Sequence, residues 1–344
     1  MDDGQVPYRD FAVEYPPAAL PAFLLPALGG GDYRPRFEGL MAGLGVAAVL
    51  LVAAMGPWWA PLFVGIAPLL LGSVVLTRFD LWPAALAAAA LAIFLAGRLR
   101  LGLGVLGVAA AAKVYPALLA PILLAHVWRT RGRREALVAA GVFFGVIAAI
   151  VLPFALVAPG GVWDAFWGQA GRPLQIESLG AGILLAAHQA FGVGLTMESS
   201  HGSQNLVGGT ADALATVTTI LQAASVLAIW VWYARGPADR DRLLRACAAV
   251  VCAFVAFGKV LSPQFLLWLI PLVPLLRGRR GLLASGVLAA ALVLTQLWFP
   301  YRYWKLALEF DAAASWLVLL RDVTLVALVA VLTLPAFAGR SRSS

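Results

Sequence analysis

Two lysines are candidate ligands for an anion. Of the 25 lysines and arginines in this 344-residue chain only three are lysines, and Lys113 and Lys259 each lie between short apolar runs. An ammonium group on a flexible stem is well suited to binding a phosphate. Lysine can instead extend to a lipid headgroup layer, but ionisable residues at such positions are candidate functional residues. We therefore predict that both lysines bind a phosphate.

Polar side chains also gather in the segment GRPLQIESLG. Arg172, Gln175 and Glu177 would combine an anion-binding guanidinium group with an amide and a carboxylate. A solvated loop would have the same composition, so the pattern alone leaves both interpretations open.

Three further carboxylates lie beside apolar runs. Asp10 and Glu14 precede the first run in GQVPYRDFAVEYPPAALP, and Asp80 precedes another in TRFDLWPA. A carboxylate placed there could act as a general base toward an incoming hydroxyl. The alternatives are an interfacial turn before a proline-started helix for Asp10 and Glu14, and a helix N-cap for Asp80.

Metal binding is not predicted. His188 and His201 are 13 residues apart, without the spacing of a helical metal-binding pair. Cys247 and Cys252 lie in one apolar run without further soft ligands, which is typical of small buried residues. We expect neither a metal nor another cofactor.

The elements that must position these residues are apolar helices. Hydrophobic residues make up 62% of the chain and charged residues only 12%, against roughly 25% charged residues in soluble domains. A chain of this length could not hide so much apolar surface from water, so we predict an all-α polytopic membrane protein formed by residues 1–344 as a single membrane domain.

The apolar runs fall into two length classes, because a helix that crosses a bilayer needs about 20 residues. The clear spans are residues 38–56, 81–97, 135–158, 213–233, 281–298 and 315–338. Shorter runs containing or flanked by proline cover residues 15–28, 60–76, 101–112, 114–128, 243–257 and 265–276. Together they predict about 11 crossings, plus re-entrant or interfacial helices.

Arginine clusters give the predicted spans a direction. They occupy short loops near residues 129–134, 235–245, 277–280 and 340–342, which is the pattern of cytoplasmic loops and not the contiguous basic face of a nucleic-acid-binding protein. The C-terminus is then cytoplasmic, and residues 1–14 and 159–212 are external. The short run 179–192 is expected to lie in the membrane interface.

The N-terminal part allows two arrangements. Either residues 15–28 cross the membrane and residues 60–76 re-enter it, or the reverse. Arg34 and Arg36 in DYRPRF favour the first arrangement, which places these arginines on the cytoplasmic side.

Six segments, in order, resemble the signature segments of glycosyltransferase family 87. They are GQVPYRDFAVEYPPAALP, TRFDLWPA, AAKVYPALLAPILLA, GRPLQIESLG, HGSQNLVGG and GKVLSPQFLLWLIPL. The resemblance implies a GT-C membrane fold in the plasma membrane. It also implies an inverting transfer of a hexose, mannose in this family, from a polyprenyl-phosphate sugar donor to a glycolipid or glycan acceptor on the outer face.

The resemblance also implies roles for individual residues. Lys113, Lys259 and Arg172 would bind the donor phosphate, and Asp10, Glu14 or Asp80 would act as the catalytic carboxylate. The cavity would be lined by Tyr115, Gln175, Glu177, His201, Gln204, Asn205 and Gln264.

The sequence departs from the family at its start. The family's first helix and its key acid normally precede the segment matching GQVPYRDF, which begins here after only three residues. The expected explanations are a start codon assigned too late, a non-catalytic paralogue, or replacement of the acid by Asp2, Asp3 or Asp10. A secondary transporter or flippase, which also uses broken helices, is the alternative function.

Overall fold

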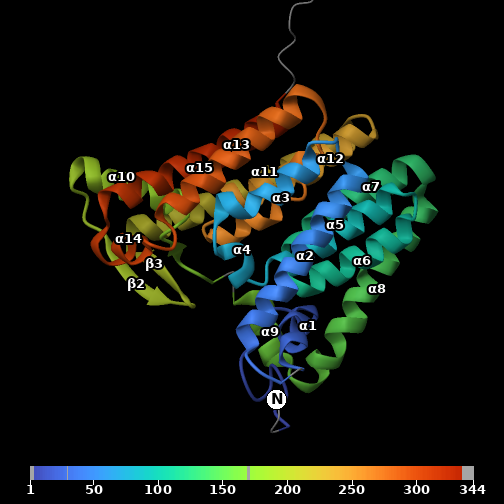
Figure 1. Ribbon diagram of the computed structural model, residues 1–344, viewed down its shortest axis with the longest axis horizontal. Coiled ribbons are helices and arrows are strands. Elements are labelled where there is room, and N and C mark those ends of the chain that lie inside the picture. The colour runs from blue at the N-terminus through green and yellow to red at the C-terminus, as the bar shows by residue number, and fades with distance from the viewer. Residues whose placement is uncertain (1–3, 29, 169–170, 335–344) are drawn as a thin grey trace, which may run out of the picture.

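The structure is a computed structural model that describes residues 4–28, 30–168 and 171–334 (Figure 1). Helices dominate the described residues, and a small three-stranded sheet accompanies them. The predicted all-α class is therefore confirmed in outline. The predicted end of the last span at Ala338, together with Arg340 and Arg342, lies outside the described residues.

Five described helices are long and apolar enough to cross a membrane. They have 21 to 27 residues, or about 32–41 Å at 1.5 Å per residue, against a hydrocarbon core of about 30 Å. These are α2 (Tyr33–Met55), α8 (Arg133–Val157), α11 (Gly209–Arg235), α13 (Gly278–Trp298) and α15 (Ala312–Thr333). Each coincides with a predicted span.

Most of the remaining apolar helices are too short to cross alone and belong to three hairpins. The first contains α3 (Ala60–Leu71), α4 (Val74–Thr77) and α5 (Leu81–Leu95). The second contains α6 (Leu99–Ala112), η3 (Tyr115–Leu119) and α7 (Ala120–Arg131), and the third α12 (Arg240–Ala256), η4 (Pro263–Trp268) and η5 (Val273–Leu275). With 14 to 17 residues, α5, α6 and α12 extend only about 21–26 Å. The predicted number of 11 crossings therefore stays a prediction.

The arginine clusters meet at one end of the helix bundle. Arg240 donates to the carbonyl of Met55 at the end of α2, and Arg245 donates to the carbonyl of Thr333 at the end of α15. Arg129 of α7 likewise contacts the carbonyl of Gly236, just after α11. We call this the arginine end. It is the arrangement expected if the clustered loops share one side of a membrane.

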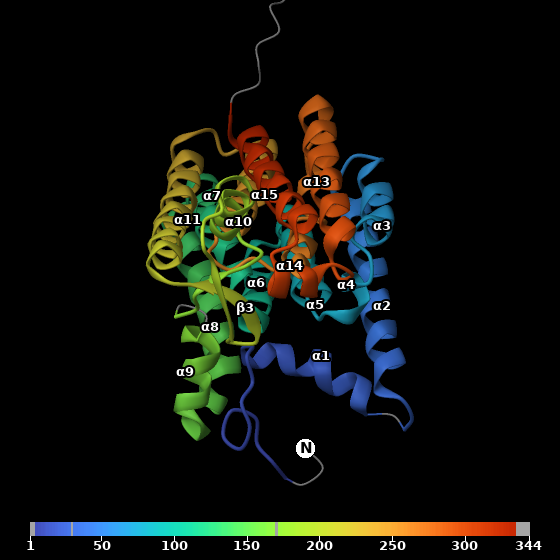
Figure 2. The same cartoon turned by 90° about the vertical axis from the view of Figure 1, so that its left-hand side faces the viewer.

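The N-terminal apolar run lies across the opposite end of the bundle, as Figure 2 shows for α1. Prolines divide it into η1 (Pro17–Ala19), α1 (Leu20–Leu24) and η2 (Leu25–Ala27). Eleven such residues extend about 16–22 Å, and they connect α6 and α8 to α2. This geometry is that of an interfacial segment, so it fits the second N-terminal arrangement better than the favoured one.

Residues between α8 and α11 form two parts. α9 (Pro159–Trp167) packs against α8, whereas α10 (Leu179–Phe191) packs against α15. A small antiparallel sheet contains β1 (Leu174–Gln175), β2 (Thr196–Ser200) and β3 (Ser203–Val207), with the strand order β1-β3-β2. The helix in the predicted run 179–192 is α10. In Figure 1 the sheet, α10 and α14 (Tyr303–Glu309) lie on one side of the molecule.

The sheet was not predicted. His201 and Gly202 connect β2 to β3, with φ angles of 53° and 67°. Two consecutive positive φ angles are the requirement of a type I′ turn, which joins antiparallel strands tightly.

Candidate functional site

The turns of the three hairpins meet around a buried ion pair. Asp80, at the start of α5, is 1% exposed, and its carboxylate lies 2.6 Å from the ammonium nitrogen of Lys113, at the end of α6. The indole nitrogen of Trp268, in η4, donates to the same carboxylate oxygen at 2.7 Å. Asp80 therefore makes no side-chain N-cap bond to α5, because its carboxylate is used between elements.

Aromatic rings enclose the Lys113 ammonium group. Rings of Tyr15, Phe79, Phe265 and Trp268 have centroids 4.9–5.3 Å from its nitrogen, within the range of a cation–π interaction. Tyr115 stacks on Trp268 with centroids 4.1 Å apart and nearly parallel planes. Together with Asp80, these rings stabilise a lysine whose side chain is only 13% exposed.

Glu14 and Arg172 lie beside the β2–β3 turn. Arg172 donates to the hydroxyl of Ser203 at 2.7 Å. A carboxylate oxygen of Glu14 lies 3.2 Å from the position that a Cβ atom would take at Gly202. Glu14 is exposed and its charge acts on both Lys113 and Arg172. An accessible carboxylate thus lies near Arg172 and near the buried Asp80–Lys113 ion pair.

Arg78 is a basic residue of this site that the sequence analysis missed. It is exposed, and among the described residues it has no hydrogen-bond or ion-pair partner. Its charge acts on Tyr15, Lys113 and Tyr303. Its position two residues before Asp80 in TRFD was the signal that could have identified it. We call the cluster of the charged residues Glu14, Arg78, Asp80, Lys113 and Arg172 the recess.

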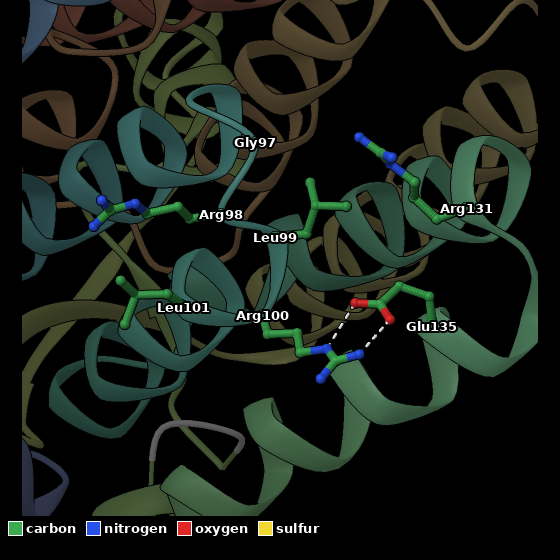
Figure 3. A pocket seen from close by; sticks show the side chains of 7 residues that line it. All are labelled: Gly97, Arg98, Leu99, Arg100, Leu101, Arg131 and Glu135. Carbon is green, nitrogen blue, oxygen red and sulfur yellow. Dashed lines mark hydrogen bonds and ion pairs between the residues drawn. The ribbon is translucent and has the colours of Figure 1, made fainter.

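A pocket of about 620 Å³ lies elsewhere, at the arginine end (Figure 3). Its lining includes Arg98, Arg100, Arg131 and Glu135, and Arg100 forms two hydrogen bonds with Glu135. In Figure 3 the guanidinium group of Arg98 points away from that of Arg131. The carboxylate of Glu135 is already paired with Arg100, so the recess is the better candidate for catalysis.

The family follows from the sequence comparisons. Residues 13–263, well over half of the chain, match Glycosyltransferase family 87. The chain belongs to glycosyltransferase family 87. Residues 195–336 also match Mannosyltransferase (PIG-M), and no curated protein shows a significant match. This family 87 chain is accordingly a glycosyltransferase by family, with several apolar helices suited to a membrane.

In this family 87 glycosyltransferase, the side chains of Gln175 and Glu177 are each buried, with 2% exposure. The Gln175 amide nitrogen donates to the Glu177 carboxylate and, at 2.9 Å, to the Ser262 hydroxyl. Its backbone N–H donates to the carbonyl of Lys259 at 3.0 Å. These bonds join β1 to the loop that carries Lys259, a half-buried side chain whose pKa is lowered by burial.

Burial raises the pKa of Glu177 to about 8, and the charge of Arg321 opposes this effect. A folded-state pKa above the unfolded value means that the folded protein binds more protons between about pH 4.5 and pH 8. Stability should therefore fall as pH rises through this window, by at most about 1.4 kcal/mol per pH unit from this group. Thermal unfolding of the purified family 87 protein from pH 5 to pH 8 measures the slope. Glu177→Gln should flatten it, and an unchanged slope would contradict the assignment.

The other predicted cavity residues of this family 87 protein are distributed around the recess. His201 is exposed in the β2–β3 turn, and Gln264 is half-buried at the start of η4. Gln204 donates to the Ser199 hydroxyl at 3.2 Å. Asn205 is fully buried and donates to the carbonyl and hydroxyl of Ser200, so its side chain holds the hairpin together.

Asp10 lies in a separate turn of the N-terminal segment. Its carboxylate pairs with Arg9 at 2.8 Å and accepts the Val6 backbone N–H at 2.7 Å. These bonds lower the pKa of Asp10 to about 2, which makes it a weak base. Within the described part of the family 87 chain, no group of three or more histidine, cysteine, aspartate or glutamate residues could hold a metal ion.

Proposed function

We propose that this protein transfers a hexose, by family resemblance mannose, from a polyprenyl-phosphate sugar to a hydroxyl group of a glycolipid or glycan. The observation that carries the proposal is the recess itself. The charge of an accessible carboxylate, Glu14, acts on Arg172 and on Lys113, and the charge of Arg78 acts on the same lysine, which pairs with Asp80. A base next to cationic groups is what displacement of a phosphate leaving group requires.

The proposed reaction is a direct displacement at the anomeric carbon of the donor sugar. Glu14 accepts the proton of the acceptor hydroxyl, whose oxygen forms the new bond to the anomeric carbon. The bond from that carbon to the phosphate oxygen breaks, and the electron pair leaves with the polyprenyl phosphate. Arg78 and Arg172 stabilise the negative charge that develops on the phosphate, and attack from the opposite side inverts the configuration.

A lipid-linked donor suits the surroundings of the recess. The hairpin turns carry polar residues on helices too short to cross a bilayer. An apolar cavity of about 260 Å³ between α2, α3 and η4 reaches Leu81 and Leu267, the neighbours of Asp80 and Trp268. Together these features favour a donor that approaches from within the bilayer.

The test is a transfer assay with the purified protein in lipid nanodiscs. Radiolabelled polyprenyl-phosphate mannose is supplied with a membrane glycolipid extract, and label in the glycolipid fraction is measured. Arg78→Ala should reduce transfer, whereas Arg98→Ala, at the arginine end, should not. Absence of transfer by the parent protein would refute the proposed function, and donor binding without transfer would favour the transporter.

We further propose that the recess faces the outside of the cell and that the arginine end is cytoplasmic. Ala12 and Thr130 are exposed near the recess and at the arginine end, and both natural cysteines, Cys247 and Cys252, are buried. In intact cells a membrane-impermeant maleimide should label Ala12→Cys. Thr130→Cys should react only after the cells are permeabilised. The opposite labelling pattern would invert the orientation.

A further inference from the structure

The N-terminal segment of residues 4–16 follows an irregular path at the end of the molecule opposite the arginine end. Figure 2 shows it beside α9. Tyr8, a non-glycine residue with φ of 70°, donates its backbone N–H to the carbonyl of Phe11 at 3.0 Å. Asp10 donates its N–H to the carbonyl of Val6 at the same distance. We call this segment the strap.

Tyr8 attaches the strap to α8 and α9. Its side chain is 5% exposed and packs with Ala158, Val162 and Ala165. Its ring lies edge-on to that of Phe154, with centroids 5.6 Å apart. A buried aromatic side chain of this size contributes strongly to a local contact, although it comes from a segment with little secondary structure of its own.

The contact requires a glycine at one position of α9. A Cβ atom at Gly161 would collide with the carbonyl oxygen of Tyr8, and would lie 3.0 Å from the Tyr8 Cα atom. A Cβ atom at the neighbouring Gly160 would meet nothing within 4 Å. Alanine in place of Gly161 would therefore displace the strap, whereas alanine in place of Gly160 would not.

The attachment continues toward the recess. The Tyr8 hydroxyl donates to the carbonyl of Tyr15 at 2.6 Å. The ring of Tyr15 lies 4.3 Å from that of Phe79, whose own ring is 4.9 Å from the Lys113 ammonium nitrogen. Glu14, the residue before Tyr15, reaches the turn at Gly202. One side chain thus fixes the strap at α9 and also bonds to the backbone next to Glu14.

We propose that Tyr8 and Gly161 are positioning residues, which hold the strap on α9 and thereby hold the Glu14 carboxylate at the recess. The expected effect of this positioning on sugar transfer rests on the proposed function. The attachment itself is independent of catalysis and can be measured without it.

The experiment compares Gly161→Ala with Gly160→Ala in the full chain in nanodiscs. Both changes replace glycine by alanine in the first turn of α9, so they alter helix propensity alike. Hydrogen–deuterium exchange of a peptide covering the strap should become at least about tenfold faster in Gly161→Ala only, since local opening governs exchange. Tyr8→Phe removes only the hydroxyl bond to Tyr15 and serves as a milder variant if Gly161→Ala does not fold.

Sugar transfer supplies the second readout. Gly161→Ala should lower kcat while leaving KM for the donor nearly unchanged. Adding Gly161→Ala to Glu14→Gln should then cause little further loss, because a residue that acts through the Glu14 carboxylate has no effect once that carboxylate is removed. Equal exchange in the two alanine variants would overturn the attachment. Faster exchange with unchanged kcat, or full additivity with Glu14→Gln, would overturn the positioning role.

The outcomes separate this inference from the proposed function. If the parent protein transfers no sugar, the proposed function fails, and exchange of the strap peptide still decides whether Tyr8 and Gly161 hold the segment that carries Glu14.

Discussion

Glu14→Gln should lower the rate of sugar transfer by about 10²–10⁴-fold, the usual contribution of a general base. The glutamine keeps the size of the side chain beside Gly202 but cannot accept the acceptor proton. KM for the donor should change little, because Glu14 acts on the hydroxyl and not on the phosphate. Initial rates at varied donor and acceptor concentrations measure both quantities.

Asp10→Asn is the matched control for Glu14→Gln. Both carboxylates lie on the strap, but Asp10 pairs with Arg9 and the Val6 N–H, so its loss should leave transfer within a few-fold of the parent. If Asp10→Asn abolishes transfer and Glu14→Gln does not, Asp10 is the base. If both variants keep normal rates, a different carboxylate must accept the proton.

Lys113→Met should destabilise the fold by about 3–5 kcal/mol, the cost of removing one partner of a buried ion pair. Asp80 is 1% exposed and would lose its counter-charge. The bond from Trp268 would remain but would not neutralise it. Unfolding of the detergent-solubilised protein in denaturant measures the loss, with the exposed Lys305→Met as control.

A double variant distinguishes the ion pair from a phosphate site. Asp80→Asn in the Lys113→Met background removes the unpaired charge, so it should recover part of the lost stability. The alternative role for Lys113, predicted from the sequence, is binding of the donor phosphate. That role would be supported if Lys113→Met stays as stable as Lys305→Met while donor affinity falls.

Most of the helices could be predicted from apolar patterning. The long helices α2, α8, α11 and α13 begin and end within five residues of the predicted spans, because a bilayer imposes both the length and the composition of what crosses it. How deeply the shorter helices enter the membrane could not be predicted from apolar patterning. A run of 14 apolar residues fits a tilted span, a re-entrant leg and an interfacial helix equally well.

Only some residues of the site could be predicted from the sequence, for a similar reason. Lys113 and Asp80 were conspicuous because charges are rare in apolar runs, but their pairing depends on which hairpins pack together. Phe265 and Trp268 were missed because an aromatic residue within an apolar run is not distinguishable by sequence from an ordinary lipid-facing or core residue. The β2–β3 hairpin was missed because His-Gly is a weaker turn signal than Asn-Gly.

The three short hairpins have a consequence for how the protein is made. The first two start and finish next to the arginine end, at Met55 and Gly97 and again at Arg98 and Arg131. Their helices α5 and α6, with 15 and 14 residues, extend only about 21–23 Å. A leg of 14 residues that ends in lysine is a poor autonomous insertion signal, because it cannot reach both interfaces. Such legs would be retained only once their packing partners are in place, namely the later-synthesised α8 beside α6 and α13 beside α3.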